Sequence, residues 1–241
     1  WALPIGNGYM GAMVFGRYDT ERIQITENSM FNPYRSDASG RGGLNNFAEI
    51  YIDFNHTNVS GYTRELNLEN AVETVSYTTG GTTYTREYLT SYPDKVLAVH
   101  LSASESGKIS FKLHPEIPYI KDYGSKAGDN QGKSGTVTAD GDTITLSGQM
   151  DYYQIQYEGQ IKVLNNGGTI TAGSENGNGT ISVENADDVT ILMAAGTNYQ
   201  LESRVFTEPD RKKKLEGYPH PHEKVSGYIN DAANYSYAEI K

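Results

Sequence analysis

Short segments in which apolar and polar residues alternate constrain the fold of this chain more than any other feature. Within residues 49–54, Ile50, Ile52 and Phe54 fall on one face of an extended segment, and residues 95–103 alternate in the same way. Turns rich in glycine and asparagine separate about a dozen such segments, and few helix-length patterns occur before residue 220. Because each strand of this kind has one face to bury, the pattern predicts an all-β fold of two large antiparallel sheets packed face to face.

Three stretches depart from this pattern. Residues 115–135 are predicted to form a long surface loop, and residues 204–223 a second irregular stretch that contains three prolines. In residues 225–240 the apolar side chains recur near one helical face, which predicts an amphipathic helix. We therefore expect a β domain over residues 1–223 and a helical linker over residues 224–241.

Composition narrows the possible partners. The chain of 241 residues has a formal net charge of −10, and its one basic cluster, residues 211–214, is flanked by acidic residues, so nucleic acid is a poor partner and a solvated loop is expected there. No apolar run of the sequence is long enough to span a bilayer, and no membrane partner is predicted. The lack of cysteine excludes disulfides and thiolate metal sites, and it is compatible with the cytoplasm or with bacterial secretion. Trp1 leads directly into a turn motif, as expected of a fragment whose leader lies upstream.

The opening segment carries Gly6, Gly8 and Gly11 in the spacing of a dinucleotide-binding loop. That spacing holds a cofactor only between a strand and a helix whose N-terminus faces the pyrophosphate. No strand is predicted before these glycines, and the residues after them predict a hairpin. Residues 132–134 spell the end of a phosphate-binding loop without its opening glycine, and we expect a solvated loop there. No cofactor is predicted.

Few other residues form a pattern typical of a catalytic or metal site. His220 and His222 lie on an extended segment with no third ligand nearby in the sequence, so no metal site is predicted. Glu27 is the best-placed carboxylate, but the favoured interpretation is a buried glutamate that orients a loop through backbone N–H groups. A glycosidase needs two carboxylates that face each other across a sugar.

Tyrosine is abundant, with 19 residues. Tyr152 and Tyr153, together with Tyr119 and Tyr123 of the predicted loop, are candidates for a platform under sugar rings. Tyrosine as strand packing is the simpler interpretation, because aromatic residues suit half-buried strands.

A four-residue sequence, Tyr-Thr-Arg-Glu, occurs twice, at residues 62–65 and 84–87. Two copies this short are compatible with chance or with a similar local arrangement at the ends of two strands. We infer no structural repeat from them.

Residues 1–16 read Trp-Ala-Leu-Pro-Ile-Gly-Asn-Gly-Tyr-Met-Gly-Ala-Met-Val-Phe-Gly, and residues 21–31 read Glu-Arg-Ile-Gln-Ile-Thr-Glu-Asn-Ser-Met-Phe. This pair resembles the N-terminal signature of glycoside hydrolase family 95, which comprises α-L-fucosidases and some α-L-galactosidases. Thr26 stands where the family usually has asparagine, and Met30-Phe31 replaces a leucine-tryptophan pair, which leaves the substrate open. Similar blocks follow in the same order at residues 46–54, 62–68, 84–94 and 186–192.

The resemblance implies a β-supersandwich that precedes a catalytic (α/α)6 barrel of the same polypeptide. The catalytic acid and the groups that activate water in an inverting reaction would then lie on the barrel, with no catalytic residue in this chain. The expected partners are that barrel and a fucosylated glycan, from which the enzyme would release α-1,2-linked L-fucose. The candidates for residues that face the barrel or border the substrate are Asn7, Arg22, Glu27, Asn28 and Phe31.

Two alternatives remain open at this point. The tyrosine content and the loop at residues 115–135 also suit a carbohydrate-binding module that recognises glycans on its own. The many carboxylates would also permit a small self-contained glycosidase.

Overall fold

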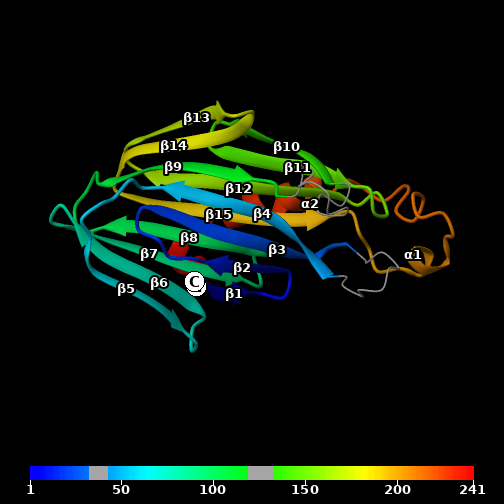
Figure 1. Ribbon diagram of the computed structural model, residues 1–241, viewed down its shortest axis with the longest axis horizontal. Coiled ribbons are helices and arrows are strands. Elements are labelled where there is room, and N and C mark those ends of the chain that lie inside the picture. The colour runs from blue at the N-terminus through cyan, green and yellow to red at the C-terminus, as the bar shows by residue number, and fades with distance from the viewer. Residues whose placement is uncertain (33–42, 119–132) are drawn as a thin grey trace, which may run out of the picture.

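The computed structural model describes residues 1–32, 43–118 and 133–241, and it shows two antiparallel sheets packed face to face (Figure 1). The first sheet has seven strands in the spatial order β1 (Leu3–Gly6), β2 (Met10–Val14), β3 (Thr20–Asn32), β4 (Gly43–Asp53), β9 (Ile109–Glu116), β14 (Asn178–Ala186) and β13 (Thr169–Glu175). The second has eight strands in the order β10 (Lys133–Asp140), β11 (Thr143–Met150), β12 (Gln156–Asn166), β15 (Asp188–Thr197), β8 (Val96–Ala103), β7 (Thr82–Ser91), β6 (Val72–Thr79) and β5 (Ser60–Asn67). The prediction of an all-β sandwich of two sheets is confirmed.

The main core lies between the sheets and follows the alternation of the sequence. Ile50, Ile52 and Phe54 are at most 9% exposed, because every second residue of a strand points to the same side. Three tyrosines are also buried in this core, namely Tyr77, Tyr88 and Tyr157. These buried rings support the simpler interpretation, in which tyrosine side chains fill the space between packed strands, for part of the 19 tyrosines.

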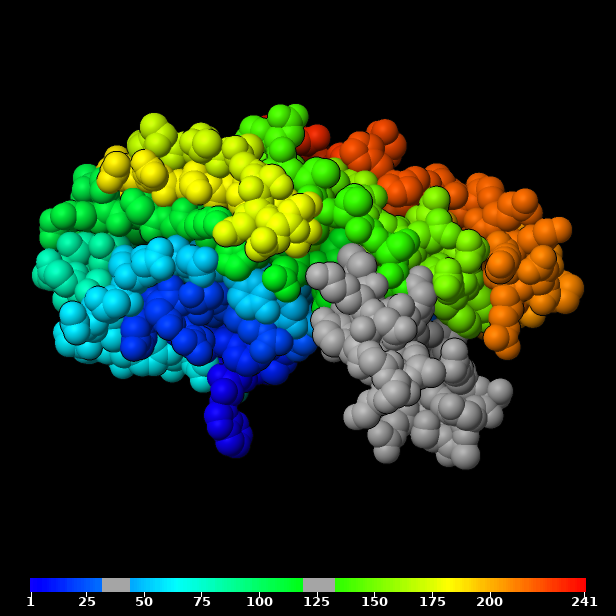
Figure 2. Space-filling model, turned by 45° about the horizontal axis from the view of Figure 1, so that its top comes forward, coloured from blue at the N-terminus to red at the C-terminus, as the bar shows by residue number. Residues whose placement is uncertain are grey.

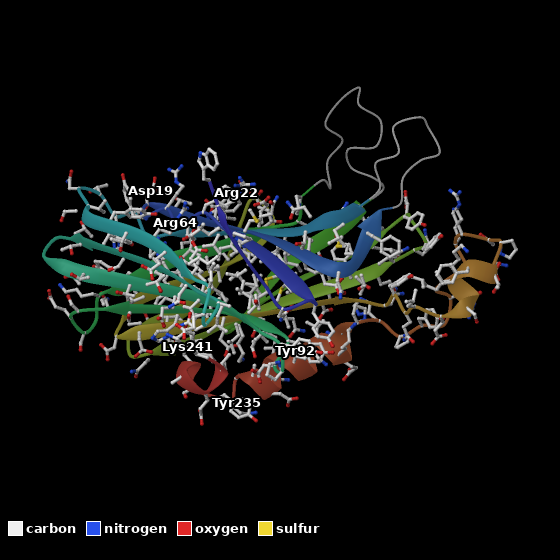
Figure 3. The ribbon with its side chains drawn as sticks, turned by 90° about the horizontal axis from the view of Figure 1, so that it is seen from below. Asp19, Arg22, Arg64, Tyr92, Tyr235 and Lys241 are labelled. Carbon is white, nitrogen blue, oxygen red and sulfur yellow. The ribbon has the colours of Figure 1, made fainter. Side chains whose placement is uncertain are left out.

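Two C-terminal helices, α2 (His222–Ala232) and α3 (Tyr237–Ile240), cover the outer face of the second sheet. Ile229 packs there with Ala98 and Leu192 in a smaller apolar cluster. Strand β8 is consequently buried on both faces, whereas its alternation predicted one, because the helices exclude water from the second face. Figure 3 shows these helices along one side of the sandwich.

The helical tail differs in detail from its prediction. The single helix expected over residues 225–240 is wrong in its middle, since α2 ends at Ala232 and α3 begins at Tyr237, where Ser236 and Glu239 form a capping box. A third short helix, α1 (Ser203–Thr207), overlaps the stretch at residues 204–223 that was predicted to be irregular, and α2 begins inside the end of that stretch.

The predicted loop at residues 115–135 is shorter at both ends, because β9 continues through Glu116 and β10 begins at Lys133. Tyr119 and Tyr123 lie outside the described residues. The solvated loop expected at residues 132–134 is wrong for Lys133, which is 3% exposed and donates from Nζ to the Asn46 carbonyl at 2.7 Å. Burial lowers the pKa of this ammonium to about 7.

The solvated loop expected for the basic cluster at residues 211–214 is also wrong at Lys214. Its side chain is 7% exposed, and Nζ donates to the carbonyl of Glu208 at 2.7 Å, so this part of residues 211–214 is not solvated. Figure 2 shows the segment around it at one end of the molecule, with the N-terminal residues projecting from another part of the surface. In the part of the chain that the structure describes, the helices are too short and too polar to cross a membrane.

Candidate functional site

The opening glycine pattern forms a hairpin turn between β1 and β2. Gly6 pairs with Gly11 across the hairpin, and Gly8 at the turn has a φ of 85°, a conformation that favours glycine. The predicted hairpin, which was placed after the glycines over residues 12–26 with its turn at residues 17–20, is confirmed by the antiparallel pairing of β2 with β3. The prediction that no strand precedes the glycines is wrong, because β1 lies before them. Since β2 rather than a helix follows, the turn has no helix N-terminus to hold a phosphate.

Two asparagines hold this signature turn, which we define as residues 6–11. Asn7 Oδ1 accepts hydrogen bonds from the backbone N–H groups of Tyr9 and Met10 at 3.0 and 2.9 Å. Its Nδ2 donates to the Ser91 carbonyl at 2.7 Å, which joins the turn to the end of β7. Asn28 Nδ2 donates to the Gly8 carbonyl at 2.9 Å, so the two predicted residues clamp the turn from two sides.

A group of aromatic residues, exposed at Tyr9 and Tyr92 and half-buried at Tyr228, lies beside the turn, and sequence reasoning did not find it. The tyrosine patch consists of Tyr9, Tyr92 and Tyr228 with Lys95 between two of the rings. The centroids of Tyr9 and Tyr92 are 5.5 Å apart, and Lys95 Nζ lies 5.3 and 4.8 Å from the centroids of Tyr9 and Tyr228. Tyr92 is 64% exposed. The patch joins the signature turn, the turn after β7 and helix α2 in one surface.

Glu27 lies beneath this surface and is 5% exposed. Its carboxylate accepts hydrogen bonds from the backbone N–H of Ser29 at 2.8 Å and from the Ser29 hydroxyl. Burial raises the pKa of Glu27, and these hydrogen bonds together with the charge of Lys224 oppose the rise. The arrangement agrees with a buried structural glutamate, but Glu27 and Asn28 belong to an irregular part of β3 rather than to the loop that was expected.

Phe31, near the end of β3, belongs to a second aromatic group. Its ring packs edge-on against Tyr199, with centroids 5.0 Å apart, and against Tyr152 at 6.0 Å. Tyr152 stacks on Tyr153 with centroids 3.8 Å apart. The two tyrosines proposed as a sugar platform therefore share a surface with Phe31, although they bury part of their rings against each other.

Arg22 lies apart from the other four candidates. Ile23 points into the core, so Arg22 points to the outer face of the first sheet. There it forms a bidentate ion pair with Glu49 at 2.8 and 2.9 Å, and its guanidinium lies 4.6 Å from the Phe15 ring centroid.

The two histidines of residues 220–222 contact a single carboxylate. His222 Nδ1 lies 2.8 Å from Glu158, and His220 Nδ1 lies 3.9 Å from it. These contacts attach the start of α2 to strand β12. Over residues 1–32, 43–118 and 133–241, no group of three or more His, Asp and Glu side chains is arranged so that it could hold a metal ion.

A buried charge cluster lies between the sheets, below the connection of β2 to β3. Glu21 and Arg86 are 0% and 2% exposed and 3.3 Å apart, and Tyr88 donates its hydroxyl to Glu21 at 2.6 Å. Glu73 is also fully buried, and its two carboxyl oxygens have no hydrogen-bond partner among the described residues. Burial, reinforced by the charge of Glu21, raises the pKa of Glu73 to about 8.

The repeated Tyr-Thr-Arg-Glu sequence places two arginines in this region. Arg64 on β5 and Arg86 on β7 both lie opposite Val75 of the strand between them. Both reach the same connection, where Arg64 donates to the carbonyl of Phe15 and Arg86 to that of Arg17. The two copies of the repeat thus place an arginine at equivalent positions on two strands. This repeat was the sequence signal that could have located the cluster.

Comparisons with known proteins show the fold of the chain and the protein family to which it belongs. The fold is that of a solved structure, "Putative kojibiose phosphorylase from human microbiome", with a TM-score of 0.60 and 13% identity over 98% of this chain and 34% of that one. A family model described as glycosyl hydrolase family 65, N-terminal domain, matches residues 1–39 and 32–202. The chain belongs to this family of glycoside hydrolase N-terminal domains.

The relatives in sequence include "Alpha-L-fucosidase 2" of Arabidopsis thaliana, 25% identical over 99% of this chain, and "Probable alpha-fucosidase A" of Aspergillus niger, 26% identical over 100%. The chain spans 33% of the length of each. The predicted resemblance to the N-terminal domain of the α-L-fucosidases is confirmed by these matches.

Proposed function

We propose that this chain is the non-catalytic N-terminal domain of a larger glycoside hydrolase that removes α-1,2-linked L-fucose from glycans by inverting hydrolysis. The observation that carries the proposal is the match to fucosidases over essentially the whole chain, together with the 33% of their length that it spans. The remaining two thirds of such a protein would hold the catalytic barrel.

The placement of the carboxylates supports a non-catalytic role. Glu21 and Glu73 lie in the interior at 0% exposure, and Glu27 is bound to Ser29 under the signature turn. A glycosidase requires two carboxyl groups that reach the glycosidic oxygen and the anomeric carbon or its water. Buried carboxylates of this kind cannot contact a sugar without unfolding their surroundings.

We place the contact with the catalytic barrel at the signature turn and the tyrosine patch. Two asparagines and a left-handed glycine hold this turn rigidly, and Tyr9 and Tyr92 present exposed rings beside it. Exposed aromatic side chains in a preorganised setting are typical of the central residues of an interface. Asn7 and Asn28 act in this proposal by holding the turn, rather than by binding substrate.

The first test is hydrolysis by the 241-residue chain. Incubated with a fucosyl-α-1,2-galactoside, the purified chain is expected to release no fucose. Turnover that survives purification and is lost on replacement of a single carboxylate would overturn the proposal in favour of a self-contained glycosidase.

The second test uses the longer polypeptide that the proposal requires. Tyr92→Ala is expected to lower the thermal stability of that polypeptide by several degrees while leaving the 241-residue chain nearly unchanged. Leu68→Ala is the matched control, since Leu68 is 86% exposed and lies outside the patch. Equal effects of Tyr92→Ala on both proteins would show that the patch makes no contact between domains.

A further inference from the structure

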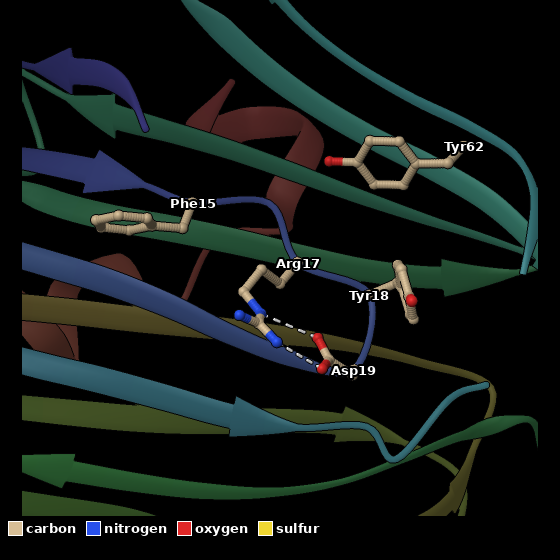
Figure 4. A pocket seen from close by; sticks show the side chains of 5 residues that line it. All are labelled: Phe15, Arg17, Tyr18, Asp19 and Tyr62. Atoms are coloured by element: carbon tan, nitrogen blue, oxygen red, sulfur yellow. Dashed lines mark hydrogen bonds and ion pairs between the residues drawn. The ribbon is translucent and has the colours of Figure 1, made fainter. Parts of the chain in front are cut away.

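A small pocket lies on the face of the sandwich away from α2 and α3. It has a volume of about 320 Å³ and is lined by Phe15, Arg17, Tyr18, Asp19 and Tyr62 (Figure 4). Figure 3 shows Asp19 on one side of the molecule and Lys241 on the other, so the C-terminal helices leave this region open. We propose that this pocket binds a neutral pyranose ring, at a site separate from the signature turn and the tyrosine patch.

The aromatic lining suits the apolar face of a sugar. The rings of Tyr18 and Tyr62 stand edge to face, with centroids 6.5 Å apart at an interplanar angle of 69°. Both side chains are about two-fifths exposed, at 38% and 42%. Rings in this arrangement offer one flat face and one edge to the C–H groups of a pyranose, which pack on aromatic carbon without loss of hydrogen bonds.

The polar lining carries no net charge and so favours an uncharged ligand. Arg17 forms a bidentate pair with Asp19, with hydrogen bonds of 3.1 and 2.7 Å to the two carboxyl oxygens. The side chains are 64% and 41% exposed, which leaves N–H groups and lone pairs free to meet a ligand. A planar donor beside a planar acceptor matches two neighbouring hydroxyl groups of a sugar, one of which donates while the other accepts.

The backbone that carries the pocket is fixed in advance by the buried charge cluster. The N–H of Gly16 donates to Glu21 at 2.7 Å, and its carbonyl accepts from the Tyr62 hydroxyl at 2.8 Å. Arg86 donates to the carbonyl of Arg17 at 2.8 Å. A Cβ at Gly16, which has a φ of 72°, would lie 2.4 Å from Arg64 Cδ, so the connection tolerates only glycine there.

This support gives the pocket a defined shape before a ligand arrives. A rigid site avoids the entropic cost of ordering a loop on binding, which matters for a weakly held single sugar ring. The volume lies near the lower end of small-molecule sites and suits one or two rings rather than a long chain. The proposal rests on this geometry and stands whether or not the domain belongs to a fucosidase.

The test is saturation-transfer NMR and titration of the 241-residue chain with methyl α-L-fucoside, methyl β-D-galactoside and lactose. At least one of the three sugars is expected to bind with a Kd in the millimolar range, on the order of 1–10 mM. Tyr18→Ala and Tyr62→Ala are each expected to weaken binding about tenfold. Tyr235→Ala is the control, with a ring that is 51% exposed and lies outside both the pocket and the tyrosine patch, and it is expected to leave the affinity unchanged.

Two further results separate binding from folding. Tyr18→Phe keeps the ring and is expected to bind nearly as well as the natural chain, with the same melting temperature. The proposal is overturned if none of the three sugars shows transfer at about 10 mM. It is also overturned if binding persists in a folded Tyr18→Ala/Tyr62→Ala chain. Neither result bears on hydrolysis, so failure here is distinct from failure of the proposed enzyme role.

Discussion

The ionisation of Glu73 should lower the free energy of unfolding as the pH rises from 5 to 7, and replacing Glu73 by glutamine should remove this loss. Glu73 on β6 is fully buried, and its oxygen atoms have no hydrogen-bond partner among the described residues. Burial is the largest cause of its raised pKa, followed by the nearby charge of Glu21, and the pKa reaches about 8 in the folded chain. The group is therefore protonated in the folded state at neutral pH and ionised in the unfolded state.

The sign of the effect follows from this difference. A carboxyl whose pKa rises on folding favours the folded state below its unfolded pKa of 4.5, and that advantage is lost as the pH rises toward about 8. For this shift the free energy of unfolding falls by about 2.5 kcal/mol between pH 5 and pH 7. Screening by water at the edge of the cluster lowers the expected value to about 2 kcal/mol. Glutamine does not ionise, so Glu73→Gln lacks this dependence.

Urea denaturation of both proteins at pH 5 and pH 7 measures the difference. Circular dichroism is the better probe, because Trp1, the single tryptophan, is fully exposed. The stability of Glu73→Gln relative to the natural chain should increase by about 2 kcal/mol from pH 5 to pH 7. Glu65→Gln is the matched control on the exposed side of β5, with no expected change. A pH-independent difference for Glu73→Gln would refute the argument, whatever its absolute size.

Three further substitutions test other parts of the structure by urea denaturation. Asn7→Ala removes the hydrogen bonds that hold the signature turn and should cost about 1–2 kcal/mol, so an unchanged midpoint would contradict the clamp. Arg86→Met leaves Glu21 buried without its cation and should cost about 3–5 kcal/mol, part of which Glu21→Gln should restore in the double variant. Ile229→Ala should cost about 2–5 kcal/mol through a cavity beneath α2, and a loss below about 1 kcal/mol would show that the helix is only loosely attached.

The strands were the most predictable part of the fold. The alternation of Ile50, Ile52 and Phe54 identified the buried face of β4, because the direction of a strand side chain depends on its own backbone. The same reasoning was incomplete for β8, where Ala98 is buried under α2. A local pattern cannot show that a helix more than a hundred residues later will cover the opposite face.

The candidate site was predictable only in part. The signature turn and Glu27 were identified from the sequence, and the structure places Asn7 and Asn28 together at that turn. Arg22 was grouped with them by the family resemblance, but it lies near the start of β3, away from the signature turn, where it forms an ion pair with Glu49. Tyr92 was missed because it approaches Tyr9 from the turn after β7, more than eighty residues away in the chain.

The sequence by itself determined where strands form, which of their faces are apolar and where the opening hairpin turns, because these features depend on interactions within a few residues. Only the tertiary structure decided which strands are neighbours, as in the pairing of β9 with β4 and β14. It also decided that Arg64 and Arg86 meet the same connection and that Tyr18 and Tyr62 form one pocket. Such contacts between distant residues depend on the free energy of the whole packed sandwich, which no local segment of the chain contains.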